Sequence, residues 1–177
     1  MKILGEKTIL VPFKLKFLPA AWKWVKDKDV NRFLIAVPPK KWKDEVKWLR
    51  NSNKDKANRL FAILEKENKK HIGTCGFTKI DKINKKASLG IMIGDKNYWG
   101  KGYGTSTITS IQKYGFEKLG LNKIHLTVFT NNPRAQSCYK KCGFREVGLL
   151  KEENIKNGKF LDEILMEILK KDFKKQQ

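Results

Sequence analysis

The amino-acid sequence predicts a mixed α/β fold with one central, twisted and largely antiparallel sheet of about seven strands, flanked by helices. Segments of strand periodicity alternate with segments of helical periodicity along the chain. Three consecutive strand-like segments are joined by turn-rich stretches, which is typical of an antiparallel meander. No repeat and no Pro/Gly/Ser-rich linker divides the 177 residues, so we expect a single domain over residues 1–177.

The amino-terminal third predicts one strand and three helices. Residues 7–11 mix β-branched with polar side chains, as strands often do. Pro19 suits the first turn of a helix, and a second short helix is expected over residues 30–34. After Pro38-Pro39 a stronger helix runs from residue 41 to about residue 51, because its apolar residues recur at steps of four and three.

The middle of the chain predicts the meander, a helix and a buried strand. An amphipathic helix is expected to start near Ser106, and Gly120 supplies its stop signal. The dense apolar run 124–129 predicts a strand that is buried on both faces. The three strands of the meander are expected over residues 60–65, 72–80 and 87–93.

The remaining residues predict one helix and a hairpin. Asn132 is a good helix cap, and Pro133 suits the first helical position because its missing N–H costs nothing there. Two further strands, 145–152 and 161–169, are expected around a turn at Asn157-Gly158. These two strands complete the sheet.

Composition excludes several classes of protein. No segment approaches the roughly 18 apolar residues of a membrane span, and we expect a cytoplasmic protein. The three cysteines are too few for a disulfide framework. Cys138 and Cys142 lie one helical turn apart, but no second pair or histidine cluster completes a metal site, so we expect no metal.

The formal charge of +21 permits two interpretations. Five of the 39 basic residues are arginines and the others are lysines, spread over the whole chain, which favours a compositional bias with solvated surface lysines. The alternative is a functional basic surface near RNA or the ribosome. Base readout usually relies on arginine, which is scarce here.

The segment 97–105 is rich in glycine and separates a strand from a helix. Gly100, Gly102 and Gly104 let the backbone turn tightly and approach a ligand. The helix that follows adds unpaired N–H groups and a positive dipole end, which together favour phosphate. A plain surface loop is the alternative, but the flanking strand and helix favour a phosphorylated cofactor.

Three stretches resemble the GNAT superfamily of acetyl-CoA-dependent N-acetyltransferases, and within it the RimJ/RimL-type branch. They are LGIMIGDKNYWGKGYGT (89–105), NPRAQSCYKKCGF (132–144) and GKFLDEILMEIL (158–169). The resemblance covers essentially the whole chain. It implies that strands 87–93 and 124–129 splay apart and hold the cofactor between them, with its pyrophosphate on the glycine-rich loop.

The resemblance also implies the site residues. Tyr139 is the implied general acid, because a phenol with a pKa of about 10 is protonated at neutral pH and can protonate the departing thiolate; packing on a helix face is its alternative role. The implied contacts to acetyl-CoA are Ile91, Met92, Ile93, Gly100, Lys101, Gly102, Tyr103, Gly104, Thr105, Asn132 and Tyr139.

Two positions depart from the pattern of the family. Trp99 stands where the loop often begins with Gln or Arg, so backbone N–H groups must carry more of the phosphate binding. Thr127 stands where the ribosomal enzymes of the branch have a catalytic glutamate, so the general base is unassigned. His125 is also explained as an ordinary, hydrogen-bonded core histidine. The candidates for a base that acts through water are Asp95, Glu65, Asp81 and His125.

The expected reaction is direct attack of a primary amine on acetyl-CoA in a ternary complex. The RimJ/RimL resemblance implies a protein N-terminal α-amine as acceptor, and a homodimer is left open. A polyamine, an aminoglycoside or an amino sugar is compatible with the same fold, although a polyamine fits the +21 charge less well. A non-catalytic CoA-binding protein or an RNA-associated protein is a further alternative. Tryptophans 22, 24, 42 and 48 fall in the region that lines the acceptor pocket in the family.

Overall fold

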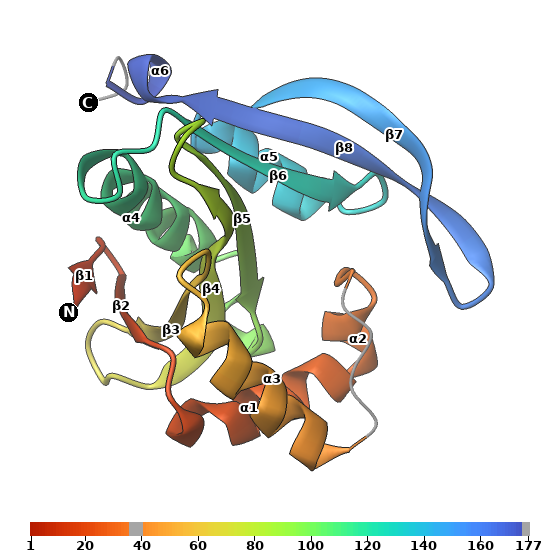
Figure 1. The fold of residues 1–177 in the computed structure, drawn as a ribbon. Coiled ribbons are helices and arrows are strands. Elements are labelled where there is room, and N and C mark those ends of the chain that lie inside the picture. The colour runs from red at the N-terminus through yellow and green to blue at the C-terminus, as the bar shows by residue number, and fades with distance from the viewer. Residues whose placement is uncertain (36–40, 175–177) are drawn as a thin grey trace.

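An eight-stranded open sheet forms the centre of the computed structural model, which describes residues 1–35 and 41–174 (Figure 1). Its strands are β1 (Ile3–Leu4), β2 (Thr8–Pro12), β3 (Arg59–Glu65), β4 (His71–Asp81), β5 (Lys86–Ile93), β6 (Lys123–Phe129), β7 (Arg145–Lys156) and β8 (Lys159–Leu169). The helices are α1 (Leu18–Lys26), α2 (Lys28–Asn31), α3 (Trp42–Lys54), α4 (Tyr103–Glu117), α5 (Pro133–Lys141) and α6 (Lys170–Lys174), with 3-10 turns at Leu15–Phe17 and Lys96–Tyr98.

The strand order is β1-β2-β3-β4-β5-β6-β8-β7, and every neighbouring pair except β5 and β6 is antiparallel. The predicted mixed α/β fold and its meander, β3-β4-β5, are therefore confirmed. The parallel pair β5 and β6 is bonded only between residues 86–88 and 123–125. Beyond that point the two strands diverge and leave a gap in the sheet (Figure 1).

The two faces of the sheet carry separate cores, as β3 illustrates. Phe61 and Ile63 point into the main core, which α4 covers. Ala62, between them, points to the other face and packs with Leu18 of α1 and Leu49 of α3. Successive side chains of a strand point to opposite faces, so this alternation places α4 on one side of the sheet and α1 with α3 on the other (Figure 1).

Short elements differ most from expectation. β1 is an additional strand of two residues that pairs with β2, and two residues carry no readable period. The helix expected over residues 30–34 is instead α2, which begins earlier because the Asp27 carboxylate caps it by accepting the Asp29 N–H at 2.9 Å. The predicted stop at Pro38-Pro39 lies outside the described residues.

Longer elements match expectation in type and differ at their ends. α4 begins at Tyr103 rather than near Ser106, because Gly102 adopts a left-handed conformation (φ 85°) and serves as its N-cap. The expected turn at Asn157-Gly158 is confirmed, with positive φ at both residues, and β7 extends to Lys156. Pro133 opens α5 as predicted.

Strand β6 is not buried on both faces, so that prediction was wrong. Ile124, Leu126 and Val128 are buried, whereas His125 and Thr127 are partly exposed. The physical reason is the placement of the helices: α4 packs on one face of β6, while on the other face of the sheet α1 and α3 pack on β4 and β3. Among the described residues, no helix is long and apolar enough to cross a membrane.

His71 is expected to make the stability of the fold depend on pH. Its ring packs against Phe13, Phe17 and Trp24, and burial lowers its pKa to about 4 despite the hydrogen bond between Nε2 and the Gly73 carbonyl. The folded protein therefore binds fewer protons at this site than the unfolded chain, whose histidine has a pKa of 6.5. We expect full stability above pH 6.5 and a progressive loss toward about pH 4.

Thermal unfolding followed from neutral pH down to about pH 4 checks this expectation. In the His71→Phe variant the midpoint temperature should depend less steeply on pH, since the titrating group is gone. An unchanged slope in that variant would assign the effect to other groups, such as His125, whose pKa burial also lowers.

Candidate functional site

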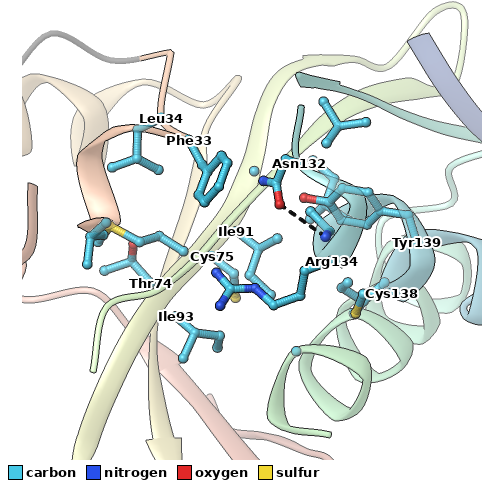
Figure 2. Close-up of a pocket in the computed structure, with 18 of the residues that line it drawn as sticks. Phe33, Leu34, Thr74, Cys75, Ile91, Ile93, Asn132, Arg134, Cys138 and Tyr139 are labelled. Carbon is cyan, nitrogen blue, oxygen red and sulfur yellow. Dashed lines mark hydrogen bonds between the residues drawn. The ribbon is translucent and has the colours of Figure 1, made fainter. Parts of the chain in front are cut away.

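The gap between β5 and β6 opens into a cavity of about 730 Å³. Its walls come from β4, β5 and the end of β6, from α1 and α2 with the residues that follow it, from the amino-terminal end of α4 and from the length of α5, with single residues of α3 and β3. Figure 2 shows Phe33 and Leu34 on one side of this cavity and Asn132, Cys138 and Tyr139 on the other. The only parallel pair in the described sheet therefore leads directly into its main cavity.

The diverging end of β5 contributes Ile91, Met92 and Ile93, as predicted for a strand edge that a ligand can reach. One main-chain group there is already paired, because the Trp99 Nε1–H donates to the Ile93 carbonyl oxygen at 2.6 Å. Trp99 thus ties the loop that follows to the end of β5, a role its apolar ring and single donor suit.

The glycine-rich loop lies at the amino terminus of α4. Gly100 (φ 72°) and Gly102 (φ 85°) both adopt left-handed conformations, and a Cβ on Gly100 would meet no atom within 4 Å. A helix leaves its first N–H groups without partners inside the helix, here those of Tyr103, Gly104 and Thr105. The loop and helix end together form an open, electropositive backbone surface that suits phosphate.

The structure brings most of the predicted site residues to this cavity but not all of them. The side chain of Lys101 is exposed, and its carbonyl oxygen accepts a hydrogen bond from Lys7 Nζ at 3.1 Å. The Tyr103 ring packs edge-on against Tyr98, with centroids 4.9 Å apart. The predicted residues that line the cavity are Ile91, Met92, Ile93, Gly100, Gly102, Gly104, Thr105, Asn132 and Tyr139.

Arg134 is a cavity residue that sequence reasoning missed. Its guanidinium lies over the Trp99 ring, 3.8 Å from the centroid. Burial and the nearby charge of Arg32 lower the pKa of Arg134. Because the pKa of an arginine starts far above neutral pH, the guanidinium keeps its charge. A cation therefore stands beside the loop although the loop begins with an uncharged tryptophan, and no local pattern pairs residues 99 and 134.

Asn132 caps α5 and still presents a donor. Its Oδ1 accepts the Ala135 N–H at 3.2 Å, and the residue is buried at the cavity wall (Figure 2). The cap uses only the amide oxygen, so the two N–H groups of the side chain remain for other partners. Asn132 can act as helix cap and as hydrogen-bond donor to a ligand at the same time.

Tyr139 lies on α5 and also lines the cavity. The residue is buried, and its hydroxyl points toward Asn132 in Figure 2. Its ring packs edge-on against Phe144, with centroids 5.9 Å apart, which fixes the ring plane. Burial raises the pKa of the phenol above its ordinary value, so Tyr139 holds its proton throughout the neutral range.

None of the four candidate bases lines the cavity. Asp95 forms an ion pair with Lys70 at 2.9 Å, Glu65 accepts two backbone N–H groups, and Asp81 binds Asn84. His125 was expected to be a hydrogen-bonded core histidine; instead its buried Nδ1 has no partner among the described residues. Thr127 does line the cavity, but a hydroxyl is no base.

The far side of the cavity is an apolar chamber, a name we use for the side chains contributed by α1–α3, the segment after α2, and β3. Of the four tryptophans expected near an acceptor, Trp48 lines it, whereas Trp22 and Trp42 pack edge-on against each other. Trp24 packs on Gly94 and His71 instead. The members of the apolar chamber are Val25, Val30, Phe33, Leu34, Ile35, Trp48 and Leu60.

The site combines groups that suit an anionic ligand, the glycine-rich loop and Arg134, with an uncharged proton donor, Tyr139. The described residues contain no group of three or more His, Cys, Asp or Glu side chains that would hold a metal ion. The free cysteines Cys138 and Cys142 lie near the hydroxyls of Thr105 and Thr109, with the Thr105 Oγ1 to Cys138 Sγ distance at 3.5 Å.

Comparison with known proteins agrees with this geometry. The protein-family model of the acetyltransferase (GNAT) domain matches residues 7–145. An uncharacterised N-acetyltransferase, p20, of Bacillus licheniformis is 28% identical over 95% of this chain and 96% of its own length. A spermidine N(1)-acetyltransferase of Vibrio cholerae is 36% identical over 73% of this chain and 75% of its own.

A solved structure extends the match to the whole fold. The crystal structure of spermidine N-acetyltransferase from Vibrio cholerae, in complex with CoA and spermine, superimposes with a TM-score of 0.89 at 27% identity. The match covers 96% of this chain and 99% of that one. The chain therefore belongs to the GNAT acetyltransferase family and is an N-acetyltransferase that uses acetyl-CoA as its cosubstrate.

Proposed function

We propose that this enzyme acetylates a small-molecule primary amine by direct attack in a ternary complex. The observation that carries the proposal is the continuity of the cavity, which runs from the glycine-rich loop through Tyr139 to the apolar chamber. Both reactants can meet there without a covalent enzyme intermediate. Relatives named as spermidine acetyltransferases favour a small amine over the protein N-terminus that the RimJ/RimL resemblance implied.

The residues present fit the cosubstrate. The left-handed Gly100 and Gly102 keep the backbone open toward a pyrophosphate, and Arg134 adds a cation beside it. The free edge of β5 beyond residue 88 offers main-chain groups to the pantetheine arm, and Asn132 offers its side-chain N–H groups. These are the contacts that we propose for acetyl-CoA.

The proposed transfer needs two contributions from the chain. Backbone N–H groups near Met92 polarise the thioester carbonyl while the amine nitrogen bonds to the acetyl carbon. The C–S bond then breaks, Tyr139 gives its proton to the departing thiolate, and the new amide nitrogen loses one proton to water, which returns a proton to Tyr139. Because no described carboxylate lines the cavity to take up an ammonium proton, we propose that the amine enters the site already neutral.

A thiol-release screen with acetyl-CoA tests the proposal, with products identified by mass spectrometry. The panel holds small primary amines and peptides with free N-termini. We expect acetylated small amines. Acetylation of the peptides alone would overturn the small-molecule proposal and restore the N-terminal one, and cofactor binding without any product would indicate a non-catalytic CoA-binding protein.

The glycine-rich loop gives a sharper test of the donor site. Gly102→Ala forces a side chain into a left-handed conformation, which costs about 1 kcal/mol and shifts the loop. We expect the KM for acetyl-CoA to rise about tenfold. The matched control is Gly120→Ala, which bears similar strain (φ 68°) away from the cavity and should leave that KM unchanged. An equal rise in both variants would indicate general destabilisation.

A further inference from the structure

The apolar chamber has a charge pattern that bears on the identity of the amine. Among the described lining residues of the main cavity, none is Asp or Glu, and the charged ones are Arg134 and Lys141. A second cavity of about 420 Å³ shares Arg134 and adds Arg32. Residues 36–40, Ala-Val-Pro-Pro-Lys, contain no carboxylate in their sequence.

The carboxylates of α2 and α3 are engaged elsewhere or lie outside the cavity lining. Asp27, the N-cap of α2, and Asp29, in its first turn, both bind Lys96, at 2.9 and 2.8 Å. Glu45 lies in the first turn of α3, outside the cavity lining. None of these three carboxylates lines the chamber.

Two aromatic rings of the site already lie against cations of the chain. A ring face attracts a cation, but Phe33 lies under Arg32, with 4.5 Å from guanidinium to centroid. Trp99 lies under Arg134 in the same way. At these two rings a further ammonium group would meet positive charge.

We infer that the acceptor is a primary amine on an apolar body, such as an arylalkyl or branched alkyl group, with no second cationic group. The inference rests on the proposed function and deepens it. An apolar body gains from burial against Val30, Leu34 and Trp48, whereas each additional ammonium of a polyamine loses water and gains no partner. This acceptor class differs from the spermidine in the names of the relatives.

The test compares kcat/KM for 2-phenylethylamine and 3-methylbutylamine with that for spermidine and spermine, by thiol release at saturating acetyl-CoA. We expect the apolar amines to be preferred by at least about tenfold. A preference for spermidine would overturn the inference and leave the proposed function intact. Failure of every small amine would overturn the proposed function itself.

A pair of substitutions at Trp48 tests the charge argument directly. Trp48 is 49% exposed on α3, so the fold tolerates a polar residue there. We expect Trp48→Glu to shift the ratio of kcat/KM toward spermidine by about tenfold, because one carboxylate gives an ammonium a partner. In the matched control, Trp48→Gln, the new side chain has nearly the same shape as glutamate but no charge. This variant should not shift the ratio toward spermidine. Equal ratios in the two variants would overturn the inference.

Discussion

Replacing Tyr139 by phenylalanine is expected to lower kcat by about 10²–10³-fold and to change the KM for acetyl-CoA little. The hydroxyl of Tyr139 lies at the cavity wall and keeps its proton, because burial raises its pKa above the ordinary value. Phenylalanine preserves the ring that packs on Phe144 and removes only the proton donor. A loss confined to kcat is the signature of a group that acts in the transition state.

The matched control is Tyr114→Phe. Tyr114 is as buried as Tyr139, 9% against 8% exposed, and both belong to the main core, but Tyr114 does not line the cavity. Its variant should keep the wild-type kcat. Equal losses in both variants would point to destabilisation, and an unchanged kcat in Tyr139→Phe would remove this residue from the mechanism. Thermal unfolding of both variants separates stability from chemistry.

The pH profile adds an independent reading. Since Tyr139 titrates above its ordinary pKa, it should cause no loss of kcat on the alkaline side of neutrality. As the pH falls below the pKa of the amine, about 10 for an alkyl amine, kcat/KM should fall because the free amine is protonated and no described carboxylate in the cavity takes up that proton. The midpoint of this fall should follow the pKa of the amine used.

The sequence predicted the fold and the donor side of the site because both depend on contiguous patterns. Strand and helix periods extend over enough residues to be read locally, and the Asn132-to-Phe144 motif covers α5 with the residues that begin and end it. The two-residue β1 and the four-residue α2 are too short for any period. The exposed face of β6 depends on where helices pack, which periodicity within the strand does not encode.

The acceptor side was less predictable because no contiguous pattern in the sequence covers it. The apolar chamber is assembled from α1, α2 and the segment after it, which come together with α3 and β3 only after folding. The protein N-terminal acceptor followed from a resemblance in the motifs of the donor side, and these motifs say little about the amine. Likewise, Trp99 was recognised as an unusual loop residue, but its partner Arg134 lies on another element.

Arg134→Gln is expected to raise the KM for acetyl-CoA by about 10–100-fold, the loss typical of one charge-assisted hydrogen bond. The guanidinium lies over Trp99 at 3.8 Å, and Trp99 is held in turn by the Ile93 carbonyl, so the cation is fixed beside the loop before the ligand binds. We propose that this stacked pair supplies the charge that the loop itself lacks.

S-acetylpantetheine, which has no pyrophosphate, separates this role from a structural one. If Arg134 binds phosphate, the variant should use S-acetylpantetheine as well as the wild-type enzyme does, while its KM for acetyl-CoA rises. Arg134→Lys keeps the charge and loses the flat stacking surface, so its KM for acetyl-CoA should lie between those of the wild-type enzyme and Arg134→Gln. Arg145→Gln, an exposed arginine that does not line the cavity, controls for the loss of one positive charge from the protein. An equal loss with both donors would show that Arg134 shapes the cavity rather than binding phosphate.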